Sequence, residues 1–486
     1  MQTRLKRNMR VFTFASLLLA ANFTSAIELD LENEDSIVSA GRTIVEHIFT
    51  IYKGNETGEI PGLLPDPYYW WHAGLMFDSL INYWAVSGDR DLTDVVSQGL
   101  AFQVGPDNNY MPPNQSKSLG NDDMAFWASA ALTAAELGLP QPQGFNVSWL
   151  QLAENTFNSI VVRWDTETCG GGLKWQIFSF NNGYNYKNSV STLTFAQLGA
   201  RLARFTGNTT YSDWAARSLT WLQEVGLFEL PSGQEGSEAS TASNRVAIYD
   251  GTDDLTNCSE INHIEWTQNA GLLLSTSAYA SNATGGTRTW SAYSFAGLVY
   301  ANTFFAGSED DSTRGIITEP ACIPTENCNV DQIAFRTLLA RGLARTRDLT
   351  LNSNTTSSEG DSTTYDTINR ILRNSALAAA RSCTGGESGN VCGLDWRSES
   401  FDGNEGIGED LAALEVILGN LPRRQFATEK ETVNGSGNGT LGAGSNAGGN
   451  NGTQVQAQGG ENAASGLRLP TFVLATLMAG AVAVLL

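Results

Sequence analysis

About twelve segments with helical periodicity run through this chain, and their recurrence constrains its fold more than any other feature. Within the segments apolar residues recur at three- and four-residue spacing, and turn residues such as Gly88-Asp89 and Gly207-Asn208 separate them. The alternation typical of strands is rarely convincing, so we predict an all-α fold. The predicted helices cover residues 35–52, 70–86, 92–104, 122–137, 149–164, 189–205, 211–225, 266–280, 287–305, 331–349, 365–382 and 407–418.

Six helical hairpins can close into a double ring, the (α/α)6 barrel, in which the ends and loops of the inner helices form a cleft. An open superhelical array of helix pairs is the alternative. The segments share no obvious repeat consensus, which favours the closed ring over the array. We therefore predict a single (α/α)6 domain over residues 27–421.

The two flanks of this domain have a different composition. Residues 1–26 combine basic residues, a short apolar run and small residues ending at Ala26, which is the layout of a secretory signal peptide. Residues 422–462 are rich in Asn, Gly and Ser and nearly free of large apolar residues, so we predict a glycosylated stalk. A secreted domain on a stalk suits the outer face of the plasma membrane.

The far end carries a second apolar run, residues 469–486, preceded by small polar residues. This pattern is typical of a signal exchanged for a glycosylphosphatidylinositol anchor, and an ordinary tail-anchoring helix is the alternative. We predict attachment at Asn462 and removal of residues 463–486. Because the spacer after Asn462 is short, Asn451 or Gly452 are alternative attachment sites.

Ten Asn-x-Ser/Thr sequons between the predicted signal peptide and the apolar tail indicate a heavily glycosylated surface. They are Asn55, Asn114, Asn146, Asn208, Asn257, Asn282, Asn354, Asn434, Asn438 and Asn451.

Six cysteines in an exported chain predict disulfides. Cys322 with Cys328 and Cys383 with Cys392 are close enough for local loops, which leaves Cys169 with Cys258. Six cysteines allow fifteen pairings, so this assignment is a preference among them.

The formal charge of −22 argues against nucleic acid and against an electrostatic grip on anionic lipid as binding partners. A neutral polymer such as a polysaccharide suits an acidic surface. We expect a monomer whose membrane attachment depends on the lipid anchor.

Metal and serine-hydrolase chemistry lack their usual signals. The three histidines, His47, His72 and His263, form no metal-binding spacing, and no Gly-x-Ser-x-Gly elbow occurs. The glycine run at residues 170–172 follows no phosphate-loop pattern. We therefore expect no metal and no cofactor.

The adjacent carboxylates Asp122 and Asp123 open a predicted helix. Acidic residues at a helix start often serve only as caps, and on position alone that interpretation is the stronger one. Glycoside cleavage, however, requires one ionised and one protonated carboxyl group, and neighbouring carboxylates push their proton affinities apart. Consecutive residues can place these groups roughly 5 Å apart, the separation associated with retention of configuration.

Aromatic and amide side chains accompany this pair and would suit a carbohydrate cleft, with rings against sugar C–H faces and polar groups on hydroxyls. For any single ring, a place in the core is the alternative. The candidate substrate-binding residues are Trp70, Trp71, Trp175, Tyr184, Asn188, Tyr249, Asp250 and Trp266.

Long stretches of this sequence resemble the fungal branch of glycoside hydrolase family seventy-six, the endo-α-1,6-mannanases, and in particular its defective-in-filamentous-growth and defective-cell-wall members. The resemblance is carried by PYYWWHAGLMFDSLINYW, FQVGPDNNYMPPNQSKSLGNDDMAFW, CGGGLKWQIFSFNNGYNYKNSVS, LGARLARFTGN, INHIEWTQNAGLLL and CGLDW…FDGNEGIGEDLAALE, which cover nearly the whole domain.

This resemblance implies an (α/α)6 glycosidase domain and a retaining mechanism with Asp122 as nucleophile and Asp123 as general acid/base. It also implies a role at the cell wall. The substrates would be α-1,6-mannan or the mannose core of glycosylphosphatidylinositol anchors, and wall glucan could be the acceptor in a transfer reaction.

The sequence departs from the family pattern at His72, Met124-Ala125, Thr192-Leu193 and Gln268-Asn269-Ala270. We expect several of these positions to lie in the cleft. These departures motivate a second hypothesis, a wall-glycan binding or scaffold protein with a decayed cleft. Retention of both aspartates favours the enzyme, because drift erodes such a pair once selection on chemistry ends.

Overall fold

The computed structural model describes residues 26–231, 245–307, 314–350 and 359–421. Most of the predicted signal peptide, the stalk, the apolar tail and the sequons Asn354, Asn434, Asn438 and Asn451 lie outside the described residues, as does Asn462. Within the described ranges no helix is both long and apolar enough to cross a bilayer.

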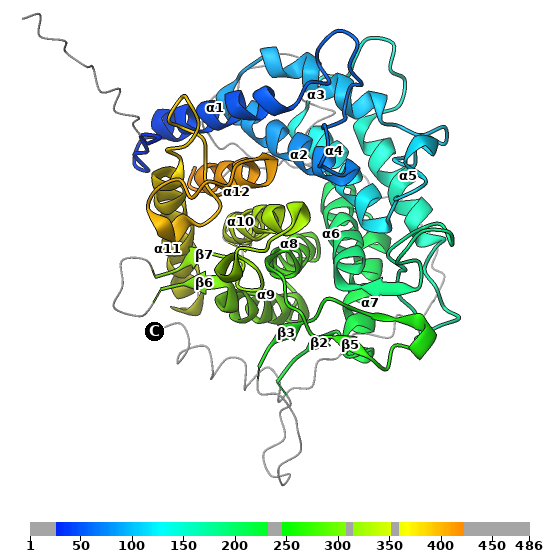
Figure 1. Ribbon diagram of the computed structural model, residues 1–486. Coiled ribbons are helices and arrows are strands. Elements are labelled where there is room, and N and C mark those ends of the chain that lie inside the picture. The colour runs from blue at the N-terminus through cyan, green and yellow to red at the C-terminus, as the bar shows by residue number, and fades with distance from the viewer. Residues whose placement is uncertain (1–25, 232–244, 308–313, 351–358, 422–486) are drawn as a thin grey trace, which may run out of the picture.

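Twelve helices in the described ranges form two concentric rings (Figure 1). The inner ring consists of α2 (Trp70–Ser87), α4 (Asn121–Leu137), α6 (Ser189–Thr206), α8 (Thr267–Ala283), α10 (Val330–Thr350) and α12 (Ile407–Leu418). The outer ring consists of α1 (Glu34–Ile51), α3 (Asp91–Phe102), α5 (Trp149–Val161), α7 (Thr210–Glu224), α9 (Arg288–Ala301) and α11 (Glu359–Ser382).

The inner ring is closed. Each inner helix packs against the next one, and α12 returns to pack against α2. An open array would leave the first and last helices apart, so the predicted all-α (α/α)6 barrel in a single domain is confirmed.

Burial follows from the place of each helix in the ring. The outer helix α1 buries one stripe at helical spacing, including Ile37, Ile44 and Ile48, while inner helix α12 is buried along its whole length. At the crossing of α8 and α10, a Cβ on Gly271 would lie 2.1 Å from the Leu338 carbonyl oxygen. Only glycine allows these two backbones to touch.

A buried charge cluster ties three inner helices together. The guanidinium of Arg341 on α10 donates to Asp78 Oδ2 on α2 at 2.5 Å and to Glu415 Oε1 on α12 at 2.7 Å. It also donates to Ser79 Oγ at 2.8 Å. Loss of Arg341 would leave two buried carboxylates uncompensated, which makes this cluster a constraint on how the ring closes.

In the part of the chain that the structure describes, seven short strands interrupt the helical pattern and were not predicted. Sheet β1–β4–β5 joins Tyr186–Asn188, Gly251–Asp253 and Ile261–Asn262, and two further pairs join β2 (Phe228–Glu229) to β3 (Ala247–Ile248) and β6 (Phe305–Ala306) to β7 (Ile316–Ile317). Strands of two or three residues are too short to show alternation in the sequence. The predicted helix 287–305 is therefore too long, because its last residue belongs to β6.

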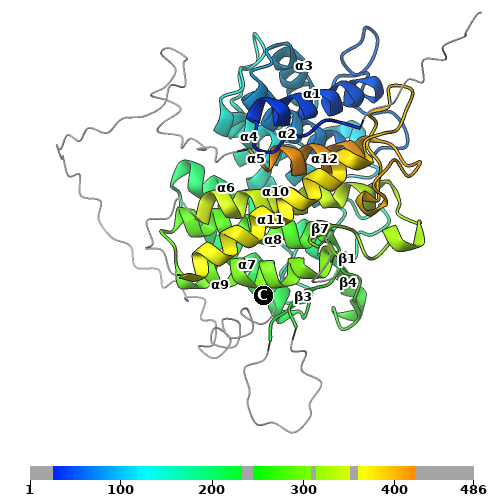
Figure 2. The same cartoon turned by 90° about the vertical axis from the view of Figure 1, so that its left-hand side faces the viewer.

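The strands β1, β4 and β7 lie at one end of the ring, on the right-hand side of Figure 2. Strand β1 pairs antiparallel with β4, with Lys187 opposite Thr252, and β1 leads directly into α6. This sheet therefore fixes the loops over the N-terminal end of α6.

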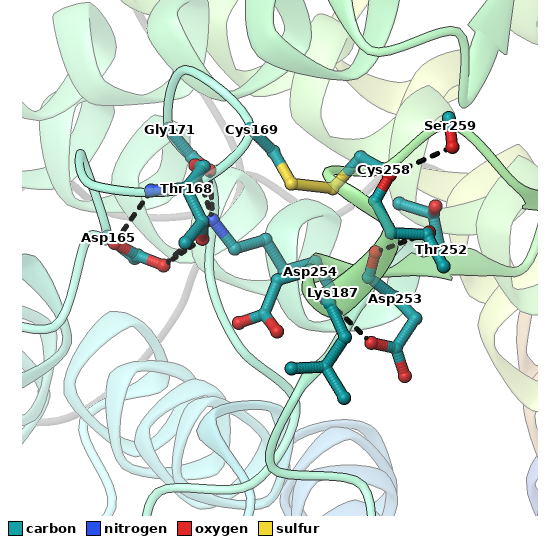
Figure 3. The surroundings of a disulfide bond; sticks show 12 residues. Asp165, Thr168, Cys169, Gly171, Lys187, Thr252, Asp253, Asp254, Cys258 and Ser259 are labelled. Atoms are coloured by element: carbon teal, nitrogen blue, oxygen red, sulfur yellow. Dashed lines mark hydrogen bonds and ion pairs between the residues drawn. A yellow bond between two sulfur atoms is a disulfide. The ribbon is translucent and has the colours of Figure 1, made fainter.

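Three disulfides join the pairs that the cysteine spacing favours: Cys169–Cys258, Cys322–Cys328 and Cys383–Cys392. The first connects the loop after α5 to the segment after β4 (Figure 3). Beside it, the Lys187 ammonium donates to the carbonyls of Thr168 and Gly171 at 2.9 and 2.6 Å and pairs with Asp165 at 3.0 Å. Disulfide and ammonium together hold this loop against the β1–β4 sheet.

The sequons Asn55, Asn114, Asn146, Asn208 and Asn257 are exposed. Asn282 is half-buried, and its Oδ1 accepts a hydrogen bond from Arg204 Nε at 3.0 Å. Glycosylation at Asn282 would therefore compete with an existing contact.

Removing Cys169–Cys258 should destabilise the protein more than removing Cys322–Cys328. Loop-closure entropy gives about 4–5 kcal/mol for the 89-residue separation of the first pair and about 2 kcal/mol for the 6-residue separation of the second. Denaturant unfolding of the two double Cys→Ser variants measures the difference. Equal losses in the two variants would contradict the entropic account.

Candidate active site

A pocket of about 550 Å³ opens at the N-terminal ends of the inner helices. Five of the six inner helices contribute side chains from their first two turns or from the residue just before them. These side chains are Tyr69, Trp70 and Trp71 of α2, Asp122, Asp123 and Phe126 of α4, Asn188 and Val190 of α6, Gln268 of α8, and Asp331 and Phe335 of α10.

The pocket concentrates negative charge. Four carboxylates line it, Asp122, Asp123, Asp250 and Asp331, and Lys117 is the one Lys or Arg among its described lining residues. The N-terminal ends of helices carry unpaired N–H groups and a partial positive charge, which favours anionic groups. The parallel inner helices thus offset part of the repulsion between these carboxylates.

Asp122 and Asp123 converge above Gly120, the N-cap residue of α4. Asp123 Oδ2 accepts the Gly120 N–H at 2.6 Å. A Cβ on Gly120 would lie 2.2 Å from Asp122 Oδ1 and 3.2 Å from Asp123 Oδ2, so only glycine leaves room for both carboxyl groups. Asp122 Oδ1 is buried and has no hydrogen-bond partner.

Burial dominates the proton affinity of the pair. It raises the pKa of Asp123 from 3.8 to about 7, and burial together with the negative charge of Asp123 raises the pKa of Asp122 well above its ordinary value. Two carboxyl groups in such contact titrate as a unit, so near neutral pH the pair holds a shared proton.

A backbone strap holds Trp175 beside this pair. The Asn121 N–H donates to the Trp175 carbonyl at 2.9 Å, and Asn121 Nδ2 donates to the Lys174 carbonyl at 2.8 Å. Arg163 Nε in turn donates to Asn121 Oδ1 at 2.7 Å. The Trp175 side chain remains 37% exposed and forms an aromatic rim at the pocket.

Asp250 lies across the pocket, just before β4, and three donors fix its carboxylate. Oδ2 accepts from the Tyr186 hydroxyl at 2.5 Å and from Asn262 Nδ2 at 3.1 Å, and Oδ1 accepts from Trp266 Nε1 at 2.8 Å. Burial raises the pKa of Asp250 although these three bonds act against it. This arrangement presents a rigid acceptor to a bound hydroxyl.

Asp331 is a fourth carboxylate of the pocket that sequence reasoning missed. Its Oδ1 accepts from Trp71 Nε1 at 2.9 Å, and burial raises its pKa. Asp331 was predicted only as the first residue of a helix. The sequence held one signal that could have identified it. Asp331 lies in the first turn of a helix of the inner ring, which is every second helix of the chain, and Asp122 and Asp123 hold the same position in α4.

Five of the eight predicted substrate-binding residues line the pocket: Trp70, Trp71, Trp175, Asn188 and Asp250. The other three do not. Tyr184 packs under the Lys174 ammonium, and the Tyr249 hydroxyl donates to Glu229. Trp266 does not line the pocket but supports Asp250, because its indole N–H donates a hydrogen bond to that carboxylate.

Most departures from the family pattern lie behind the pocket wall, against our expectation. Of these residues only Gln268 lines the pocket. Thr192, Leu193, Asn269 and Ala270 are buried in the inner helices, Met124 packs on Arg163, and His72 is fully buried beneath Tyr69. Successive residues of a helix point to different faces, so a residue next to a cleft residue in the sequence need not line the cleft.

No group of three or more His, Cys, Asp or Glu side chains in the described ranges is arranged to hold a metal ion. Carboxylates, amides, aromatic rings, Ser118 and Lys117 line the pocket.

The model of the Glycosyl hydrolase family 76 matches residues 36–431 of this chain. The chain is 39% identical, over 409 residues, to the mannan endo-1,6-alpha-mannosidase DCW1 of Saccharomyces cerevisiae, and the match covers 84% of each protein.

Two solved structures share the fold. Dfg5 from Chaetomium thermophilum, solved in complex with glucosamine, is 34% identical with a TM-score of 0.71, over 82% of this chain and 94% of that one. An inactive variant of an alpha-1,6-mannanase of Salegentibacter sp. HEL1_6, in complex with alpha-1,6-mannotetrose, has a TM-score of 0.59 at 15% identity, over 79% of this chain and 98% of that one.

The family model spans nearly the whole double ring, including the helix that carries the aspartate pair, and the DCW1 relative is similar across the same domain. The chain therefore belongs to glycosyl hydrolase family 76, a family of glycoside hydrolases.

Proposed function

We propose that this protein cleaves α-1,6-mannosidic bonds by a retaining mechanism. The observation that carries the proposal is the convergence of Asp122 and Asp123 on Gly120 within a pocket, where burial keeps a proton on the pair. Its family and the name of its DCW1 relative, a mannan endo-1,6-alpha-mannosidase, support mannan as the substrate. Two close carboxyl groups are the arrangement expected for retention.

In the proposed first step, Asp123 donates its proton to the glycosidic oxygen while the Asp122 carboxylate attacks the anomeric carbon. The bond from that carbon to the glycosidic oxygen breaks, the leaving sugar departs with the proton, and a mannosyl ester forms on Asp122. Burial raises the pKa of both carboxyl groups, so the pair holds a proton near neutral pH that Asp123 can donate while Asp122 attacks as the carboxylate.

In the second step Asp123, now ionised, removes a proton from an incoming hydroxyl, which attacks the same carbon and frees Asp122. Water gives hydrolysis, and a sugar hydroxyl gives transfer to another glycan. We propose the mannose core of glycosylphosphatidylinositol anchors as a further donor and wall glucan as an acceptor. Trp70, Trp71 and Trp175 offer ring faces to the sugars, Asp250 offers an acceptor to hydroxyls, and Asn188, whose Oδ1 already accepts the Ser191 N–H, offers its amide N–H groups.

The placement of the departing residues argues against the alternative hypothesis, a scaffold protein with a decayed cleft. Of the departures that suggested decay, only Gln268 faces the pocket, while Asp122 and Asp123 both do. We therefore favour the enzyme.

We also propose that the protein acts as a monomer at the outer face of the plasma membrane and in the cell wall, held by a lipid anchor at Asn462. The proposed secretion and anchoring rest on the sequence of residues 1–26 and 463–486. Phosphatidylinositol-specific phospholipase C should release the protein from intact cells, and Asn462→Gln should shift attachment or abolish it. Retention after phospholipase treatment would favour a tail-anchoring helix instead.

Replacing either aspartate should abolish turnover, but in distinguishable ways. Asp122→Ala should reduce kcat/KM on α-1,6-mannan by on the order of 10³-fold or more, because no ester can form. Asp123→Ala should cost about 10²–10⁴-fold and lose less on a substrate with an activated aryl leaving group, which needs no acid. Azide should rescue Asp123→Ala with retained configuration and Asp122→Ala with inverted configuration.

Asp94→Asn is the matched control, since Asp94 is an exposed acid in the first turn of outer helix α3. It should retain full activity, and circular dichroism should show that all three variants are folded. Wild-type rates in Asp122→Ala would refute the assignment of the nucleophile.

The pH dependence should report the raised pKa of Asp123. A general acid works only when protonated, so kcat/KM should fall as pH rises through about 7 and not through the ordinary value of 3.8. Rates on mannan and on an activated aryl mannoside, measured from about pH 4 to 9, test this. An alkaline limb near pH 4 on mannan would contradict a buried, protonated Asp123.

A further inference from the structure

Asp331 lies in the first turn of α10, yet the helix does not need it as a cap. The Asn329 N–H donates to Gln332 Oε1 at 2.9 Å, and the Gln332 N–H donates to Asn329 Oδ1 at 3.0 Å. This reciprocal capping box already satisfies the helix start. The Asp331 carboxylate is instead directed into the pocket that holds Asp122 and Asp123.

Two residues of α2 fix Asp331, although α12 separates α2 from α10 in the ring. Trp71 Nε1 donates to Asp331 Oδ1 at 2.9 Å. His72 Nδ1 accepts the Tyr69 N–H at 3.1 Å, so a neutral His72 carries its proton on Nε2. That nitrogen lies 3.2 Å from the Val330 carbonyl oxygen and 3.5 Å from Asp331 Oδ1.

His72 holds the backbone next to Asp331 without neutralising the carboxylate, because its Nε2 hydrogen bond goes to the Val330 carbonyl oxygen and Asp331 Oδ1 lies farther away, at 3.5 Å. Its side chain is fully buried, and burial lowers its pKa to about 4, so it is uncharged when the enzyme works near neutral pH. The contact between His72 and Asp331 is therefore not an ion pair. His72 therefore leaves the charge of an ionised Asp331 unneutralised in the pocket that holds the catalytic pair.

We propose that Asp331 is a positioning carboxylate whose negative charge holds the catalytic proton on the Asp122–Asp123 pair, and that Trp71 and His72 fix it for this role. The inference rests on the proposed function, since it gives that reaction its pH range. A neutral side chain of the same shape could still accept the hydrogen bond from the Trp71 indole. The structure therefore needs only an acceptor at this position, whereas the proposed role needs a negative charge.

The other charges around the pair do not supply this field. Asp250 faces the pocket but is engaged by three hydrogen-bond donors, and Tyr69 and Tyr186 are neutral phenols. Lys117, on the pocket lining, and Arg163, bound to Asn121 behind α4, carry positive charge and act in the opposite direction. The repulsion from Asp331 raises the pKa of both Asp122 and Asp123.

Asp331→Asn removes the charge and preserves the shape and the acceptor for Trp71. The alkaline limb of kcat/KM on α-1,6-mannan should move about one unit to lower pH, because a like charge in the same pocket shifts a pKa by about that much. At pH 8 this shift is a loss of about tenfold, while rates well below the limb stay close to wild type.

His72 provides the second arm of the test. His72→Leu loses the hydrogen bonds to the Tyr69 N–H and the Val330 carbonyl oxygen. It should move the alkaline limb of kcat/KM to lower pH, by less than Asp331→Asn does. His72→Gln can still accept from Tyr69 and donate to Val330, so it should keep the limb in place. Asp94→Asn, which removes an exposed charge from outer helix α3, is the control for long-range electrostatics.

A titration without substrate separates this inference from the proposed function. Carboxyl ¹³C resonances of labelled aspartate, assigned by their loss in Asp122→Asn and Asp123→Asn, should titrate at lower pH in Asp331→Asn. Should wild type fail to cleave mannan, the proposed function falls while this titration still decides the role of Asp331. An unmoved titration and limb in folded Asp331→Asn, with only KM raised, would overturn the inference and make Asp331 a sugar ligand.

Discussion

The convergence of inner-helix N-termini on one pocket is the constraint from which the proposed chemistry follows. Burying several carboxylates together is unfavourable unless donors or opposite charges offset the repulsion. Here five inner helices direct their N-terminal ends at the same space, and few side-chain cations line it. The helix ends tolerate the carboxylates without neutralising them, so burial can still keep a proton on the aspartate pair.

The ring must stay closed for these helix ends to meet. Glycines at the α8–α10 crossing let two inner helices touch, and the Arg341 cluster joins α10 to α2 and α12, where the ring closes. On the pocket side, the Cys169–Cys258 disulfide and Lys187 hold the loops that lead to β1 and β4. Stability and site geometry therefore depend on the same contacts.

Helical periodicity was sufficient to predict the helices, and it placed Asp122 and Asp123 at a helix start, where the structure has them beside the pocket. It could not show that Tyr184, Tyr249 and Trp266 stay out of the pocket, since that depends on which partner each side chain meets across the sheet. Asp331 escaped for a related reason. Its sequence position is that of an ordinary helix start, and only the fold brings α10 within reach of α2, where Trp71 binds the Asp331 carboxylate.

The central claim is that Asp122 bonds to the anomeric carbon while its neighbour carries the proton. Trapping the enzyme with a fluorinated mannosyl fluoride, followed by peptide mass spectrometry, tests this most directly, because the slowed second step lets the ester accumulate. The account predicts one mannosyl group per protein, on Asp122, and none in Asp122→Asn. A label on Asp123 or Asp331, or turnover without any covalent adduct, would contradict it.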